Sequence, residues 1–398
     1  MRVLLLAAAW AAVAPQGVVF EPKPRLVSPG REPVIAVRAS GALSLLEVEG
    51  KDLFLKTSFD AGDSFETKVR VNDVPGEVAA HHESSPRMSV RSRSEFYILW
   101  QTRRDGEASA LRFARSTNWG ESFSKAGDVE PGNATASQGF YNMAVSPKGV
   151  VYVAWLDGRD RAKSKPGTSA VYLARSTNRG VSFDKPVRVT LDTCPCCRPS
   201  IAFTGDDNVH VAWRGVINDD IRDIFMATSA DGGATFSKGV RVAEDNWKIS
   251  GCPHSGAVLT SVQKRILATW STVREGKAQL YAAWSDDNGR TFSARTRVAD
   301  TVVDPNHPSV VSMGDRAAIV FQGRPSGKSA GWGQVNAYYR EIDVAGKLSP
   351  LVRLGNAKAS ASYPELAYEE PGRVFVAWTE AAGDDDSHRV VLLRGRRE

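Results

Sequence analysis

The octapeptide Ser229-Ala230-Asp231-Gly232-Gly233-Ala234-Thr235-Phe236 occurs, with variations, five times along this chain. The other copies begin at Ser58, Ser116, Ser176 and Ser285, so successive copies lie 58, 60, 53 and 56 residues apart. The side chain of Asp or Asn at the third position can form a hydrogen bond with the backbone two residues later, and Gly at the fifth position can adopt a positive φ. Because an apolar run precedes each copy and a short second run usually follows, we expect each copy to be a turn between antiparallel strands.

A second repeated feature indicates the number of sheets. Strand-like segments that end in Trp or an equivalent residue recur seven times, at 43–47, 96–100, 151–155, 209–213, 266–270, 317–321 and 374–378. This count predicts an all-β, seven-bladed β-propeller, with a six-bladed propeller as the alternative. The last repeat stops after residues 390–393, and residues 24–27 resemble its missing strand, so we expect the N-terminal strand to close the last blade of a single domain over residues 20–398.

Residues 1–16 are typical of a secretory signal peptide. A short basic start at Arg2 is followed by the apolar run 3–13 and by a small-x-small site at 12–14, with the cleavage position left open. We therefore expect export, to the periplasm or outside the cell, with no transmembrane segment after cleavage. The chain carries 51 Lys and Arg against 45 Asp and Glu, which is too dilute an excess to predict a nucleic-acid partner, and we expect a monomer.

The octapeptide is the Asp box, and five copies at this period resemble the sialidase superfamily and other Asp-box (BNR-repeat) β-propellers. The resemblance covers essentially the whole mature chain, although a catalytic sialidase domain has six blades. The segment Cys194-Pro195-Cys196-Cys197-Arg198-Pro199 further resembles a motif of exported bacterial sialidase-like proteins, a likeness that implies a fold rather than a reaction.

The strand directions place the starts of the first strands of all blades on one face, opposite the Asp boxes. Residues just before those starts should surround the propeller axis, and they include Arg, Cys, His and Tyr. The resemblance to sialidases implies that Arg31, Arg198 and Arg324 hold a substrate carboxylate, that Tyr363 with Glu365 is the nucleophile pair, and that Asp219 or Asp220 is the acid. Solvated loop charges are the alternative for each residue.

Blade 4 carries the best match to the acid-bearing loop of sialidases, because the corresponding loop of blade 1, residues 47–52, is too short. This loop adds Arg214 and Arg222 to the expected substrate-binding residues. Trp247 joins them as a side chain that could stack on a sugar, although we favour the alternative that it covers the neighbouring cysteines.

All four cysteines precede the first strands of blades 4 and 5, so we expect them to meet near the axis. They are Cys194, Cys196, Cys197 and Cys252. Two disulfides are one interpretation for an exported protein, but adjacent cysteines bridge only with strain. A second interpretation is a soft-metal site, for Cu(I) first and Zn second, with His254 and His307 as nitrogen ligands. A third interpretation is one disulfide beside two free cysteine ligands.

Three functions remain open from the sequence. The first is an exported sialidase-like propeller that binds an anionic or glycan ligand at its axial face, including a glycoside hydrolase of the exo-sialidase type. The second is a periplasmic copper, soft-metal or thiol-redox protein that uses the cysteine cluster. The third is a non-catalytic interaction propeller.

Overall fold

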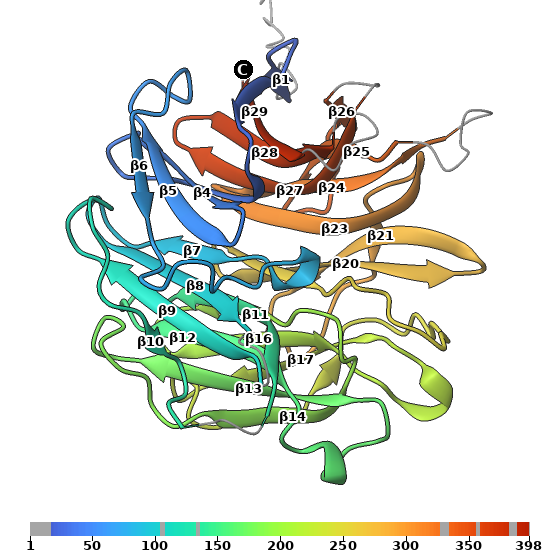
Figure 1. Cartoon of the computed structure of the whole chain (residues 1–398). Helices are drawn as coiled ribbons and strands as arrows, with labels where there is room; N and C mark the ends of the chain where they lie inside the picture. The colour runs from blue at the N-terminus through green and yellow to red at the C-terminus, as the bar shows by residue number, and fades with distance from the viewer. Residues whose placement is uncertain are drawn as a thin grey trace, which may run out of the picture.

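Seven antiparallel sheets follow one another along the chain around a central axis, as the computed structural model shows for residues 17–103, 108–132, 136–326, 334–355, 359–381 and 388–397 (Figure 1). Blade 1 contains β3 (Arg31–Val37), β4 (Leu43–Glu49), β5 (Asp52–Ser58) and β6 (Thr67–Arg70). Blade 2 contains β7 (Arg87–Val90), β8 (Phe96–Thr102), β9 (Ala110–Ser116) and β10 (Gly127–Asp128). Blade 3 contains β11 (Gln138–Val145), β12 (Val151–Asp157), β13 (Ser169–Ser176) and β14 (Val187–Thr193). Blade 4 contains β15 (Ser200–Thr204), β16 (Asn208–Arg214), β17 (Ile224–Ser229) and β18 (Val240–Arg241). Blade 5 contains β19 (Val258–Val262), β20 (Arg265–Arg274), β21 (Lys277–Ser285) and β22 (Thr296–Arg297). Blade 6 contains β23 (Val302–Met313), β24 (Arg316–Pro325), β25 (Asn336–Asp343) and β26 (Val352–Leu354). The predicted seven-bladed propeller is confirmed, and the six-bladed alternative is wrong.

The last blade is closed by the N-terminus. Blade 7 contains β27 (Ser360–Glu369), β28 (Arg373–Ala381) and β29 (His388–Arg397). Strand β2 (Arg25–Ser28) pairs with β29 around Val391, which confirms the predicted closure. A further strand that the sequence did not predict, β1 (Val18–Phe20), pairs with the end of β29, so the two ends of the described part of the chain lie side by side (Figure 1). The predicted signal peptide lies outside the described residues.

The Asp boxes are turns held by their own side chains. In blade 4, Ser229 donates to Asp231 Oδ1 at 2.6 Å, and the backbone N–H groups of Gly233 and Thr235 donate to the Ser229 hydroxyl at 2.7 Å and to Asp231 Oδ1 at 2.9 Å. Gly233 has a φ of 86°, which requires glycine at this position. The boxes therefore use their acidic residues to form turns between the third and fourth strands.

The core is divided between neighbouring blades. The tryptophans that end the second strands are completely buried at Trp100, Trp155, Trp270 and Trp378. One cluster joins Leu46 of blade 1 with Phe96 of blade 2, and equivalent clusters continue around the ring. A cluster that joins Leu43 of blade 1 with Phe375 of blade 7 completes this series.

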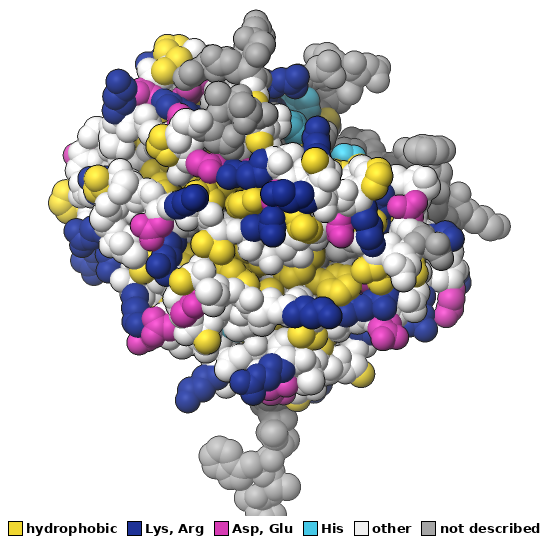
Figure 2. All heavy atoms as spheres, turned by 90° about the horizontal axis from the view of Figure 1, so that it is seen from below, with side chains coloured by type: hydrophobic (Ala, Val, Ile, Leu, Met, Phe, Trp, Pro, Cys, Tyr) yellow, Lys and Arg dark blue, Asp and Glu magenta, His cyan; other side chains and the backbone are white. Residues whose placement is uncertain are grey.

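The described connections contain three single-turn 3-10 helices, η1 (His82–Ser84), η2 (Arg161–Lys163) and η3 (Asn218–Asp220). Among the described residues, none of the helices has the length and apolar character needed to cross a bilayer. Figure 2 shows one face of the molecule, on which Lys and Arg side chains are interspersed with acidic and hydrophobic ones rather than gathered in one block.

Candidate functional site

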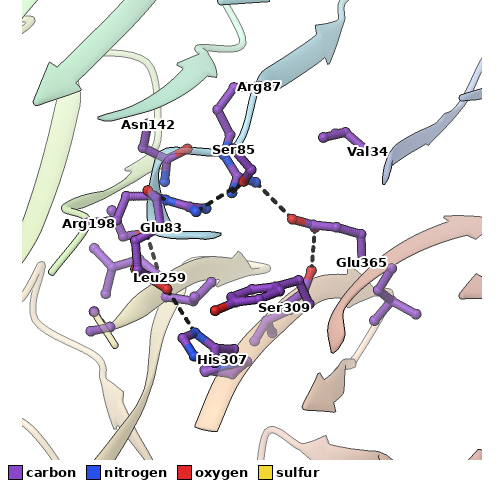
Figure 3. A pocket seen from close by; sticks show the side chains of 18 of the residues that line it. Val34, Glu83, Ser85, Arg87, Asn142, Arg198, Leu259, His307, Ser309 and Glu365 are labelled. Atoms are coloured by element: carbon purple, nitrogen blue, oxygen red, sulfur yellow. Dashed lines mark hydrogen bonds and ion pairs between the residues drawn. The ribbon is translucent and has the colours of Figure 1, made fainter. Parts of the chain in front are cut away.

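A cavity of about 300 Å³ lies on the propeller axis, and the first strand of every blade contributes to its wall. Its polar side chains include Glu83, Ser85, Arg87, Asn142, Arg198, His307, Ser309, Tyr363 and Glu365 (Figure 3). The apolar part of the wall includes Val34 and Leu259. The expectation that the axial face carries the polar ring is thus met by the geometry.

Four residues of the first strands share an unusual backbone conformation. Glu32, Phe140, His307 and Tyr363 have φ values of 54°, 49°, 49° and 52°, which are unfavourable for residues with a side chain. Each lies where the ladder between the first and second strands shifts register. Such bulges turn side chains away from the regular strand faces and are frequent beside functional sites.

Two arginines converge on one hydroxyl in the cavity. Arg87 Nη2 donates to Ser85 Oγ at 3.0 Å, and Arg198 Nη2 donates to the same atom at 3.1 Å (Figure 3). Arg198 is also fixed by a bond of 2.8 Å from Nε to the carbonyl oxygen of Glu83. The two guanidinium groups, from blades 2 and 4, therefore meet at one point of the wall.

Two carboxylates face these arginines. Glu365 accepts from Arg87 Nη1 at 2.9 Å and from the Ser309 hydroxyl at 2.9 Å. Glu83 Oε1 lies 2.8 Å from His307 Nδ1. The cavity therefore combines cationic donors with anionic acceptors, an arrangement that can bind a ligand carrying both a charged acid and hydroxyl groups.

Tyr363 packs on His307, with ring centroids 4.6 Å apart. Burial, followed by the nearby charges of Glu83 and Glu32, raises the pKa of Tyr363 above its ordinary range. Tyr363 and Glu365 both line the cavity, where Glu365 bonds Arg87 and Ser309, and their roles as nucleophile and partner remain a prediction.

The predicted arginine cluster is only partly assembled. Of its three members, Arg198 lines the cavity. Arg31 instead donates to the carbonyl oxygen of Ala80 at 3.1 Å, and Arg324 lies 3.3 Å from Asp304. Arg87, which the sequence analysis did not single out, takes the second cationic position.

The residues of the blade 4 loop lie around the cysteines. Arg214 is buried and donates to the carbonyl oxygens of Ser255, Ser271 and Arg222. Its donors therefore hold the backbone, and the residue is not among those that line the axial cavity. Its guanidinium carbon lies 5.1 Å from the centre of the Trp247 ring. Asp220 is exposed in η3, and the side chain of Asp219 lies outside the described part of the chain.

Arg87, Glu365 and Ser309 share a signal that the sequence contains. Each stands two residues after the ring position of its blade, Ser85, Tyr363 or His307. Extending the predicted ring by one such step would have found Arg87. Glu83 lies in η1, for which the repeat offers no equivalent signal.

The cysteines meet as predicted, beside the cavity wall. Cys194 Sγ lies 3.3 Å from Cys197 Sγ and 3.6 Å from Cys196 Sγ, and these three residues are buried. The sulfur of Cys196 also lies within 4.8 Å of the donor atoms of Cys252 and His254, which are exposed. Bonds from the neighbouring thiols lower the pKa of Cys194 well below its ordinary range. The predicted metal ligand His307 contacts Glu83 and Tyr363 instead, because its blade lies on another side of the axis.

A family model described as a BNR repeat-like domain matches residues 94–376. The chain belongs to this BNR repeat-like family. The match confirms the resemblance drawn from the Asp boxes, whereas the narrower likeness drawn from the cysteine motif remains a prediction. No curated protein sequence matches the chain.

Solved structures similar to this BNR-repeat chain include a protein of unknown function from Dyadobacter fermentans, which is 14% identical with a TM-score of 0.55 and covers 96% of this chain and 100% of its own. An ulvan lyase bound to -[GlcA(1-4)Rha3S]- is 10% identical with a TM-score of 0.58, covering 95% and 94%. A leech intramolecular trans-sialidase complexed with 2,7-anhydro-Neu5Ac is 11% identical with a TM-score of 0.51, covering 90% and 82%. At these identities the likeness shows the fold of the BNR-repeat chain and leaves its chemistry to its own residues.

Proposed function

We propose that the axial cavity binds an acidic sugar residue of a glycan, through its carboxylate or sulfate group. The observation that carries this proposal is the convergence of Arg87 and Arg198 on Ser85 Oγ inside the cavity. Two planar guanidinium groups aimed at one point match the oxygens of a carboxylate or sulfate, which they bind with paired, charge-assisted hydrogen bonds.

The rest of the wall suits the neutral part of a sugar. Glu83 offers carboxylate oxygens to hydroxyl groups, and Tyr363 offers a ring face and a protonated phenol, the pKa of which is raised by burial. A volume of about 300 Å³ is at the lower limit of ligand sites, so we expect one sugar residue inside the cavity and the remaining glycan outside.

The neighbours support this class of ligand. The ulvan lyase is described with an acidic, sulfated disaccharide and the leech enzyme with a sialic acid derivative, so this fold accommodates carboxylated sugars in other proteins. Hydrolysis of the sialidase type is a second candidate, favoured by the presence of Tyr363 in the cavity. Its roles for Tyr363 as nucleophile, Glu365 as its partner and Asp219 or Asp220 as acid remain part of this second proposal.

The test measures binding of glucuronate-, sialate- and sulfate-bearing oligosaccharides by calorimetry. We expect Arg87→Ala and Arg198→Ala each to weaken binding by at least tenfold, since each removes a charge-assisted hydrogen bond of about 1.5–3 kcal/mol. Arg70→Ala, on the outer strand of blade 1, is the matched control and should bind normally. Preference for neutral glycans, or binding that neither cavity variant weakens, would contradict the proposal.

The wild type and a Tyr363→Phe variant test the second candidate function, hydrolysis of the sialidase type. Cleavage of a fluorogenic sialoside by the wild type that is lost in Tyr363→Phe would assign hydrolysis, and binding without turnover would leave a glycan-binding propeller.

We also propose that the protein is exported, which the signal-like pattern of residues 1–16 supports. The mass of the mature protein from cell fractions tests it.

A further inference from the structure

The cysteine cluster is a site that glycan binding does not use. It is built where the starts of blades 4 and 5 meet, from the segment before β15 and the segment before β19. Gly256 permits this meeting, because a Cβ there would lie 2.1 Å from the carbonyl oxygen of Arg198. The donors therefore come from two blades that are packed in backbone contact.

Five donors form two sets of three that share one sulfur. The inner set is Cys194, Cys196 and Cys197, and the outer set is Cys196, Cys252 and His254, with the ligand atoms of each set within 4.8 Å of one another. The inner set is buried, whereas Cys252 and His254 are exposed. A metal ion could therefore reach the outer set from solvent and pass to the inner set through Cys196.

The number of donors argues against a closed structural zinc site. Structural zinc sites are closed by four ligands in a tetrahedron, and the described residues gather here in threes rather than in a set of four. Thiolate sulfur is a soft ligand that favours Cu(I), and Cu(I) is satisfied by three ligands. The outer set adds one imidazole, which is also a suitable ligand for copper.

Arg222 distinguishes between a metal site and disulfides. Its Nη1 donates to Cys194 Sγ at 3.3 Å, and its Nε is buried without a hydrogen-bond partner among the described residues. A buried guanidinium is costly unless a negative charge accompanies it. Three thiolates around one Cu(I) carry a net charge of about −2 and would add to the negative charge of Asp220 near Arg222, whereas disulfide sulfurs carry none.

The distances agree with this view. A trigonal metal site with bonds of about 2.3 Å holds its sulfurs about 4.0 Å apart, and a disulfide holds them at about 2.05 Å. The observed distances of 3.3 Å and 3.6 Å from Cys194 are closer to the first arrangement, so small side-chain rotations would complete it.

We propose that Cys194, Cys196 and Cys197 bind Cu(I) as a buried trithiolate site, with Cys252 and His254 as its solvent-facing approach and Arg222 as its counter-charge. This proposal is independent of the glycan site, because it uses none of the residues that carry the proposed sugar contact.

The experiment titrates the reduced full-length protein with Cu(I) in competition with bicinchoninate. We expect the wild type to take copper from the competitor, Cys196→Ser to bind at least 100-fold more weakly, and Cys252→Ser and His254→Ala to bind about tenfold more weakly. His388→Ala, at the exposed start of β29, is the control and should match the wild type. X-ray absorption at the copper edge should show sulfur ligands at about 2.3 Å.

Alkylation and mass spectrometry before reduction count the thiols of the purified protein. Four oxidised cysteines, together with no copper uptake after reduction, would overturn the proposal in favour of two disulfides. It would equally be overturned by tighter binding of Zn(II) than of Cu(I), or by copper affinity that Cys196→Ser leaves unchanged. If Cys196→Ser does not fold, the variants of exposed Cys252 and His254 still decide the result.

Discussion

His307 Nδ1 lies 2.8 Å from Glu83 Oε1, although 224 positions separate the two residues in the chain. Glu83 belongs to the short helix η1 before blade 2, and His307 belongs to the first strand of blade 6. This contact crosses the axial cavity, so it depends on the closed ring rather than on any one blade. The candidate site is therefore a property of the whole propeller.

The proposed anion site makes a prediction about Glu365. This carboxylate accepts from Arg87 at 2.9 Å and so neutralises part of the charge that an anionic sugar would meet. In Glu365→Gln the Ser309 bond can remain while the competing charge is lost, and we expect the acidic ligand to bind about fivefold more tightly, a gain of ~1 kcal/mol. Calorimetry with one acidic oligosaccharide measures the change. Weaker binding would mean that Glu365 contacts the ligand directly and that Arg87 does not receive its acid group.

Closure of the ring makes a second prediction. Deleting residues 20–30 removes β2 and its pairing with β29, which exposes an edge that no other described strand covers. We expect the cooperative melting transition to be lost. A control that lacks only residues 1–16 retains β1 and β2 and should melt like the full chain. A deleted protein that melts within about one degree of the control would contradict the closure, since losing even 1 kcal/mol shifts the midpoint further.

The repeats made the fold predictable, and their irregularities hid the site. Glycine at the fifth position of the five Asp boxes and tryptophan in five of the second strands follow from local turn and packing needs, which recur from blade to blade. Arg87 and Glu365 meet only because closure of the ring brings blade 7 within one blade of blade 2, and no local pattern encodes that distance. The bulge at Tyr363 also departs from the repeat, because the positive φ and the register shift between Ser362 and Glu365 follow from no sequence period.

The Asp boxes predict how acid destabilises the protein. The hydroxyl and backbone N–H of Thr291, with the Ser285 hydroxyl, lower the pKa of Asp287 to about 2. Its stabilising effect is therefore complete above the unfolded pKa near 4 and is lost as the pH falls toward about 2. We expect Asp287→Ala to lower the free energy of unfolding by about 1 kcal/mol at pH 7, and this difference to shrink as the pH falls through that interval.

Asp287→Asn is the matched control, because Asn118 and Asn178 accept the same backbone bond from Ser122 and Ser182 in their own boxes. Denaturant unfolding at several pH values measures the three proteins. We expect the Asn variant to lose less than half as much stability as the Ala variant at pH 7. An Ala variant whose loss is as large at pH 2 as at pH 7 would show that the charge of Asp287 plays no part in the turn.

Gly256 links the two candidate sites, and its substitution should impair both. A Cβ at this position would lie 2.1 Å from the carbonyl oxygen of Arg198, so alanine must force apart the starts of blades 4 and 5. We expect Gly256→Ala to lower the free energy of unfolding by about 1–3 kcal/mol and to weaken both acidic glycan and Cu(I) binding. Gly251→Ala is the control, because the nearest atom to its Cβ, in Ile249, lies 3.8 Å away. Denaturant unfolding, calorimetry and copper competition on the same two variants give the three readouts. If Gly256→Ala loses stability yet keeps both affinities, the two sites do not depend on the close contact between these blades.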